Sequence, residues 1–217
     1  MKEILKLTLA LAFICAVAGI ALAFVSQKTA TPREKARIAQ RDAKMKLLLP
    51  AETASVHEAF SDEGVVFFAA HDSAGDAIAF CAEGSDPNGF SGEVKVLVGF
   101  NPDGAIRGVM VSEHSETPGV GSRACNRETT KSFWSLFHKS DGEAEKEQSL
   151  PPNSYLDSYN NLPLTGGEFQ FGQPSSGQTT TNYVMPITGA TVSSTAIRNA
   201  VNRIASVARK RISFTKE

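Results

Sequence analysis

The stretch EVKVLVGFNPDGAIRGVMVSEH, residues 93–114, decides the fold of this chain. Its first eight residues place Val94, Val96, Val98 and Phe100 at every second position, the period at which side chains share one face of a β-strand. The next four residues, NPDG, carry proline and glycine where a tight reversal needs them, and AIRGVMVSEH returns as a second apolar run. The stretch therefore predicts an antiparallel β-hairpin with one buried face.

A second hairpin is expected on the N-terminal side of the first. The apolar runs GVVFFAA (64–70) and AIAFCAE (77–83) flank HDSAGD, whose aspartates, serine and glycine are typical of turns. Between the two hairpins, GSDPNGFSG (84–92) contains three glycines and a proline, which predicts a loop. After the hairpins, SETPGVGSR (115–123) predicts a glycine-rich loop that is either an ordinary turn or a lid over a ligand.

The last helix of the chain is expected over residues 194–212, and hydroxyl residues gather at its start. Its apolar face carries Ile197, Val201, Ile204 and Ala208. The hydroxyl residues are Thr188, Thr191, Ser193 and Ser194. Two interpretations stay open for them. They cap the unpaired amides of the first helical turn, or those amides bind a phosphate that one hydroxyl contacts or esterifies, with Gly189 and Ala190 keeping the approach open.

Two further segments complete the soluble part. NRETTKSFWSLF (126–137) predicts a short helix whose aromatic residues, Trp134 among them, fill a core. Residues 140–181 are polar and rich in Gly, Pro, Ser and Asn, which predicts long loops with one strand around GEFQF (167–171). Because strands and helices are segregated along the chain, we expect an α+β domain with a twisted antiparallel sheet and packing helices.

The N-terminal segment LTLALAFICAVAGIALAFV (7–25) has 19 residues without a charge, and Lys2 and Lys6 precede it. As a helix it would extend roughly 28 Å, close to the thickness of a bilayer hydrocarbon core. A cleavable secretory signal is the alternative, but the apolar run is longer than the usual signal core, so a retained single transmembrane helix is favoured. Basic residues follow the span as well, so charge does not fix its orientation.

The whole chain divides into four expected parts. Residues 1–27 form the membrane anchor, and 28–50 form a linking helix that ends at Pro50. Residues 51–88 form the N-terminal hairpin part of the soluble domain, and 89–212 form its main ligand-binding part. The formal net charge of −1 gives no support for a nucleic-acid binder.

Metal and acid–base sites are not expected. The four histidines lack the spacing of metal ligands, although His114 stands beside the glycine-rich loop as a candidate proton donor. Cys81 and Cys125 match no zinc, haem or redox motif, and we expect buried free thiols, with a disulfide between them as the alternative.

Three motifs in a fixed order give the chain a family resemblance. They are VLVGFNPDGAIRGVMV (96–111), HSETPGVG (114–121) and TGATVSS (188–194). With them, the chain resembles the FMN-binding domain family found in the G subunit of Rnf-type ion-translocating oxidoreductases and in the C subunit of sodium-translocating NADH:quinone reductase. The resemblance covers the anchor, the linking helix and most of residues 89–212.

The resemblance implies a covalent flavin. In that family the threonine of an S/T-G-A-T motif carries FMN through a phosphoester bond, which a separate flavin transferase makes from FAD. The corresponding residue here is Thr191. By the same resemblance Thr188, Gly189 and Ala190 form the recognition turn, Ser193 and Ser194 lie beside the phosphate, and Glu116, Thr117, Pro118 and Gly119 lie next to the flavin. Met185 and Pro186 stand where the family commonly has an acidic residue, and Thr188 stands where it usually has serine.

The function that the resemblance implies is electron transfer. The chain would be a subunit of an Rnf-like complex in a bacterial inner membrane, with its soluble domain on the extracytoplasmic side. It would relay electrons through FMN between ferredoxin and NAD with coupled ion transport, and alone it would turn over no substrate. Two alternatives remain: a free-standing anchored flavoprotein that donates electrons, and a non-redox interaction domain in which the serines only cap the helix.

Overall fold

The computed structural model describes residues 2–127, 150–172, 182–212 and 214. The chain divides into two compact units, Met1–Asp42 and Ala43–Glu217. The first unit is the exposed part of α1 (Lys2–Leu48), a continuous helix that passes through Pro32. In the described part of the chain, α1 is the one helix whose length and composition would let it cross a membrane. Its apolar side chains, such as Leu9 and Phe13, are exposed, as expected of an anchor.

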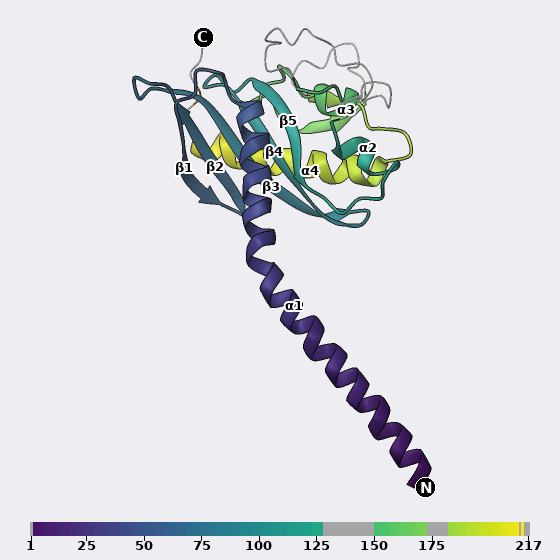
Figure 1. Ribbon diagram of the computed structural model, residues 1–217. Helices are drawn as coiled ribbons and strands as arrows, with labels where there is room; N and C mark the ends of the chain where they lie inside the picture. The colour runs from purple at the N-terminus through teal and green to yellow at the C-terminus, as the bar shows by residue number, and fades with distance from the viewer. Residues whose placement is uncertain (1, 128–149, 173–181, 213, 215–217) are drawn as a thin grey trace, which may run out of the picture. The chain divides into compact units, whose positions relative to one another are not determined.

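The second unit is built on a five-stranded antiparallel sheet in which each strand pairs with the next one along the chain (Figure 1). The strands are β1 (Ser55–Asp62), β2 (Val65–His71), β3 (Ala77–Gly89), β4 (Gly92–Phe100) and β5 (Ile106–Glu113). Both hairpins expected from the sequence, β2–β3 and β4–β5, are confirmed. The alternating residues of β4 are buried on one face, as their period predicts.

The expectation of a loop over residues 84–92 is wrong. β3 continues to Gly89, and β4 begins at Gly92 after a two-residue reversal. A register shift between Asp86 and Gly89 accommodates Pro87, which cannot donate a ladder hydrogen bond. The strand β1 was not predicted, because it is an edge strand with several exposed positions and no continuous apolar run.

The helix α4 (Thr191–Arg211) packs on one face of the sheet, mainly against β3 and β4 (Figure 1). Gly84 allows a close approach there, because a Cβ at this position would lie 2.8 Å from Ile204 Cγ1. The helix begins three residues before the expected start at 194, so Thr191 is its first residue. It therefore carries Thr191, Ser193 and Ser194 inside its first turn, whereas Thr188 precedes it.

The opposite face of the sheet is covered by the end of α1, within the second unit. Met45, Leu48 and Leu49 form a separate buried cluster with residues from β2 to β5. Cys81 belongs to this cluster, whereas Cys125 belongs to the cluster on the α4 side. Both thiols are buried and neither forms a disulfide in the described part of the chain, so the disulfide alternative is wrong.

Small elements complete the second unit. They are α2 (Ser122–Cys125), α3 (Ser154–Asp157) and a parallel pair, β6 (Phe169–Phe171) with β7 (Asn182–Val184). The strand expected around GEFQF is thus present as β6. Of the helix expected over 126–137, Asn126 and Arg127 are not helical, and residues 128–137, including Trp134, lie outside the described residues.

Candidate functional site

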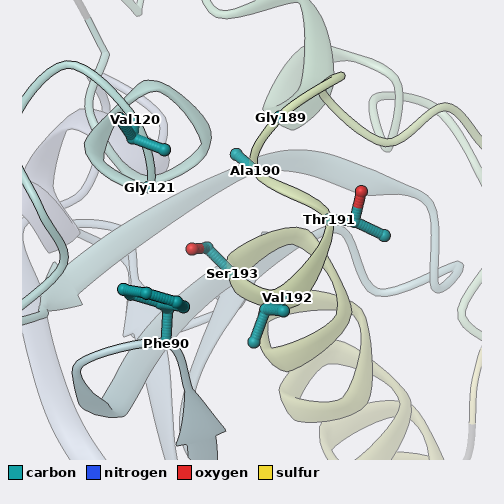
Figure 2. A pocket seen from close by; sticks show the side chains of 8 residues that line it. All are labelled: Phe90, Val120, Gly121, Gly189, Ala190, Thr191, Val192 and Ser193. Atoms are coloured by element: carbon teal, nitrogen blue, oxygen red, sulfur yellow. The ribbon is translucent and has the colours of Figure 1, made fainter.

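A cavity of about 290 Å³ lies at the N-terminal end of α4 (Figure 2). Three segments that are far apart in the sequence form it: the turn between β3 and β4, the loop after β5 and the first turn of α4. The lining residues are Phe90, Val120, Gly121, Gly189, Ala190, Thr191, Val192 and Ser193. The sheet therefore brings the glycine-rich loop and the hydroxyl cluster together at one end of the last helix.

The first amides of α4 have no acceptor in the described part of the chain. Ala190 is the N-cap residue, and no side chain caps the helix there. Its carbonyl accepts the first helical hydrogen bond, from Ser194 N–H at 2.9 Å. Among the described residues, no acceptor is found for the amides of Thr191, Val192 and Ser193. The capping interpretation of the hydroxyl cluster is therefore wrong, and three N–H donors with the positive end of the helix dipole are available to an anion.

The hydroxyl residues of this turn have different surroundings. Thr191 is exposed, and its side chain points away from Phe90 and Val120 (Figure 2). Ser193 is buried, and its hydroxyl points toward the side of the cavity where Phe90 lies (Figure 2). Ser194 does not line the cavity: its Oγ accepts a hydrogen bond from the Ile187 amide at 3.3 Å. Thr191 and Ser193 are thus the hydroxyl residues that a ligand in the cavity can reach.

Gly189 shapes the approach to the helix. Its φ of 84° lies in the left-handed region that favours glycine, and no atom stands within 4 Å of the place where a Cβ would be. Thr188, beside it, is exposed but does not line the cavity. Of the expected recognition turn, Gly189 and Ala190 therefore contribute to the cavity itself.

The loop after β5 reaches the cavity, but none of the four residues expected next to the flavin, Glu116 to Gly119, lines it. Val120 and Gly121 line the cavity, whereas Thr117, Pro118 and Gly119 lie outside its lining. The loop is closed on itself, because the amides of Val120 and Ser122 both donate to the Thr117 carbonyl.

Glu116 is buried behind the cavity. Its exposed fraction is 4%, and its Oε1 accepts a hydrogen bond from the Phe90 amide at 2.8 Å. Its Oε2 is buried and has no hydrogen-bond partner among the described residues. The pKa of the Cys125 thiol is raised to about 12, mainly by burial and to a smaller extent by the negative charge of Glu116. This cysteine is therefore a neutral and unreactive group.

His114 does not line the cavity. Its Nδ1 accepts a hydrogen bond from the Glu116 amide at 3.2 Å, so the ring proton of the neutral form belongs on Nε2, which lies 2.8 Å from Asn126 Oδ1. Both ring nitrogens are thus used to hold the loop. The geometry gives the expected proton donor a structural contact instead of a position facing the cavity.

Phe90 and Val192 line the cavity although the sequence did not indicate them, and Val120 and Gly121 were expected only as parts of the lid loop. Phe90 is 71% exposed and occupies the two-residue turn between β3 and β4, and Val192 is 49% exposed within the hydroxyl cluster. The available signal was an aromatic residue in a turn. With Val120 and Val192 it forms a group of exposed apolar side chains, and such a group often marks a binding site. Because residues 84–92 were expected to form a loop, the position of Phe90 in a tight turn was not recognised. Together, these three side chains make one side of the cavity apolar.

The chemistry available at this site is binding and positioning. In the described part of the chain no group of three or more His, Cys, Asp or Glu residues could hold a metal ion. The free amides suit a phosphate, the exposed Thr191 hydroxyl is accessible to modification, and the apolar side suits a flat ring system.

Several known proteins share sequence or structure with this chain. Residues 89–206 match a family model described as the FMN-binding domain. The G subunit of an ion-translocating oxidoreductase complex from Haemophilus influenzae is 43% identical over 58 residues, a match that spans only 27% of each chain. The G subunit of the Na(+)-translocating ferredoxin:NAD(+) oxidoreductase complex from Acetobacterium woodii is 26% identical over 216 residues, covering 93% of this chain and 89% of the relative. Among solved structures, the C subunit of the Na(+)-translocating NADH-quinone reductase from Parabacteroides distasonis has a TM-score of 0.47 at 14% identity, covering 70% of this chain and 64% of that one.

Proposed function

Because the chain belongs to the FMN-binding domain family, we propose that it carries FMN on Thr191 and relays electrons as a membrane-anchored subunit of an ion-translocating oxidoreductase complex. The observation that carries this proposal is the first turn of α4. There an exposed threonine hydroxyl stands beside three amides that have no acceptor among the described residues. A phosphate esterified to Thr191 would receive the hydrogen bonds that the protein itself leaves unmade.

The residues around the cavity fit such a group. The amides of Thr191, Val192 and Ser193 would hold the phosphate, and Gly189 leaves the approach open. The apolar side chains of Phe90 and Val120 would lie against a ring system and exclude water from one side of it. When bound, FMN supplies the electron-transfer chemistry, and the protein supplies anchoring and orientation.

The placement in a membrane complex rests on α1 and on the relatives. An exposed apolar helix at the N-terminus would anchor the chain in a bacterial inner membrane as a single-pass protein, with the flavin domain on the extracytoplasmic side. The relatives from Haemophilus influenzae and Acetobacterium woodii are named as parts of ion-translocating complexes, so other subunits of an Rnf-like complex would be the electron donor and acceptor. A flavin transferase would be needed for maturation, and the purified chain alone would catalyse no substrate turnover.

Mass spectrometry tests the attachment directly. The chain is produced with and without a flavin transferase, and intact mass and peptide masses are compared for the wild type, Thr191→Ala and Thr195→Ala. Thr195 is a matched control because its hydroxyl bonds the Thr191 carbonyl and does not line the cavity. We expect an FMN-sized adduct on the Thr191 peptide of the wild type and of Thr195→Ala, and none on Thr191→Ala. An adduct that persists in Thr191→Ala, or a wild type that stays unmodified with the transferase, contradicts the proposal.

A further inference from the structure

The Glu116 carboxylate is enclosed between two glycines behind the cavity. A Cβ at Gly89 would lie 2.6 Å from Glu116 Oε1, and a Cβ at Gly121 would lie closer still to Glu116 Oε2. Such contacts are far below van der Waals distance, so both segments approach the carboxylate only because they carry glycine there. Gly89 ends β3, and Gly121 lies in the loop after β5. One buried carboxylate thus fills the space between two of the three segments that form the cavity.

Each carboxylate oxygen faces a different part of the site. Oε1 accepts from the amide of Phe90, the residue whose ring stands 71% exposed at the cavity. Oε2 lies on the side of Gly121 where Ser193 Oγ also lies, because a Cβ at Gly121 would be 2.7 Å from that hydroxyl oxygen. His114 holds the backbone of Glu116 in turn, because its Nδ1 accepts a hydrogen bond from the Glu116 amide. The carboxylate therefore links the aromatic turn to the glycine-rich loop, and Gly121 of that loop lies against Ser193 in the first turn of α4.

We propose that Glu116 is a positioning residue, which fixes the Phe90 turn relative to the start of α4 and so determines where the ring system of the cofactor lies. The proposal rests on the proposed function for the identity of that cofactor. Glu116 acts through Phe90 and Gly121, because it is buried behind the cavity and does not line it. A neutral side chain without an acceptor would leave the Phe90 amide unpaired and the turn free to move away from α4.

The first test measures the Phe90 amide and needs no cofactor. Hydrogen exchange of the full chain in detergent micelles is followed by NMR for the wild type, Glu116→Ala, Glu116→Gln and Asp103→Ala. Asp103 is a matched control because its Oδ1 accepts the Ala105 amide at 2.8 Å in the neighbouring β4–β5 turn. We expect Glu116→Ala to speed exchange of the Phe90 amide roughly tenfold to a hundredfold, the loss expected for a hydrogen bond to a charged acceptor.

The two remaining variants decide between a specific and a general effect. Glu116→Gln keeps an oxygen that can accept from Phe90 and should restore most of the protection, whereas Asp103→Ala should leave the Phe90 amide unchanged. Should Glu116→Ala fail to fold, Glu116→Asp carries the same expectation, because its shorter side chain withdraws the carboxylate from that amide. An unchanged Phe90 exchange rate in Glu116→Ala, or in Glu116→Asp if that variant is needed, overturns the proposal.

The second test reads the position of the flavin. In protein loaded by the transferase, quenching of flavin fluorescence by iodide should rise at least twofold in Glu116→Ala, stay near the wild-type value in Glu116→Gln and be unaffected in Asp103→Ala. Equal quenching in the wild type and Glu116→Ala overturns the positioning role even if FMN is bound to Thr191. A wild type that accepts no FMN overturns the proposed function instead, and the amide exchange result then decides the structural half of the proposal.

Discussion

Gly99 and Gly108 are register partners on β4 and β5, and together they leave the space that Leu48 fills at the end of α1. A Cβ at Gly99 would lie 2.9 Å from both the Cβ and the carbonyl oxygen of Leu48. A Cβ at Gly108 would lie 2.6 Å from Leu150 Cδ1 and 3.0 Å from Leu48 Cδ2, which are the ends of flexible side chains. The pair of glycines thus lets the last turn of α1 pack directly on the sheet.

The first prediction is that Gly99→Ala destabilises the second unit more than Gly108→Ala does. The new methyl group at 99 meets backbone and Cβ atoms that cannot move without shifting α1, so overpacking should lower the free energy of unfolding by about 1–3 kcal/mol. At 108 the leucine side chains can change rotamer, and the loss should be smaller. Equilibrium urea unfolding in detergent measures both, and equal losses would contradict this account of the contact.

The second prediction concerns Arg127, whose guanidinium is 3% exposed and lies 2.6 Å from Asp157 Oδ1. It also donates to the carbonyls of Val109 and Pro151, so one side chain ties β5 to α3. Arg127→Met leaves the carbonyls of Val109 and Pro151 without their donor, whereas Asp157 is 37% exposed and keeps contact with water. We therefore expect a loss of about 1–3 kcal/mol in the free energy of unfolding.

The exposed pair of Lys210 and Glu63 provides the control for that prediction. Its partners are 56% and 52% exposed. Surface pairs of this kind contribute about 0–1 kcal/mol, so Lys210→Met should have a small effect on the same unfolding measurement. If Arg127→Met and Lys210→Met lower the free energy of unfolding equally, the buried Arg127 side chain contributes no more to stability than a surface pair does.

The third prediction is a loss of stability at high pH that depends on Cys125. Burial and the Glu116 charge raise the pKa of this thiol from 9.0 to about 12 in the folded state. As the pH rises, the thiol ionises in the unfolded chain before it ionises in the folded one. The stabilisation that the neutral buried thiol contributes is therefore complete below about pH 9 and is lost as the pH rises toward 12. The midpoint temperature of thermal unfolding of the wild type should therefore fall over this pH range.

A cysteine variant separates this contribution from the buried tyrosines. Burial also raises the pKa of Tyr155 and Tyr159, so at still higher pH both tyrosines lower the stability of the fold in the same way. In Cys125→Ala, the decline of stability above pH 9 should be less steep than in the wild type. Cys81→Ala, which removes the other buried thiol, serves as the comparison. A pH profile that is identical in Cys125→Ala and the wild type would argue against the shifted thiol.

The central hairpin was predictable from the sequence because one physical rule governs it. In β4, Val94 and Val98 lie at alternating positions on the face that packs against α4, and the NPDG turn fixes the register. The other face of β4 is buried as well, because the end of α1 covers Leu97 there. The edge strand β1 follows no such rule, since it has one exposed side and polar residues such as His57 and Glu58. The strand β1 forms because it packs against and pairs with the neighbouring strand β2.

The candidate site was predictable only where local chemistry defines it. The hydroxyl cluster and Gly189 pointed to the start of α4, and both belong to one continuous segment. Phe90 belongs to a turn about a hundred residues earlier in the chain, and the sheet alone brings it to Thr191. The absence of a side-chain cap at Ala190 is likewise a property of the folded turn, because four nearby hydroxyl residues made capping the simpler expectation.

The last prediction concerns Phe90 as the aromatic surface against which the flavin ring lies. Its ring is exposed although the residue is bound through its amide to buried Glu116, so the position favours an aromatic side chain in contact with a ligand over one that fills a core. Phe90→Ala should still receive FMN on Thr191, because the phosphate is held by the α4 amides. Its flavin should be more accessible to iodide and should show a shifted visible absorption band, since the stacking surface is lost. Phe90→Tyr keeps the ring and should match the wild type in both measurements. If Phe90→Ala matches it as well, the flavin lies elsewhere, on the side of α4 toward which the Thr191 side chain points.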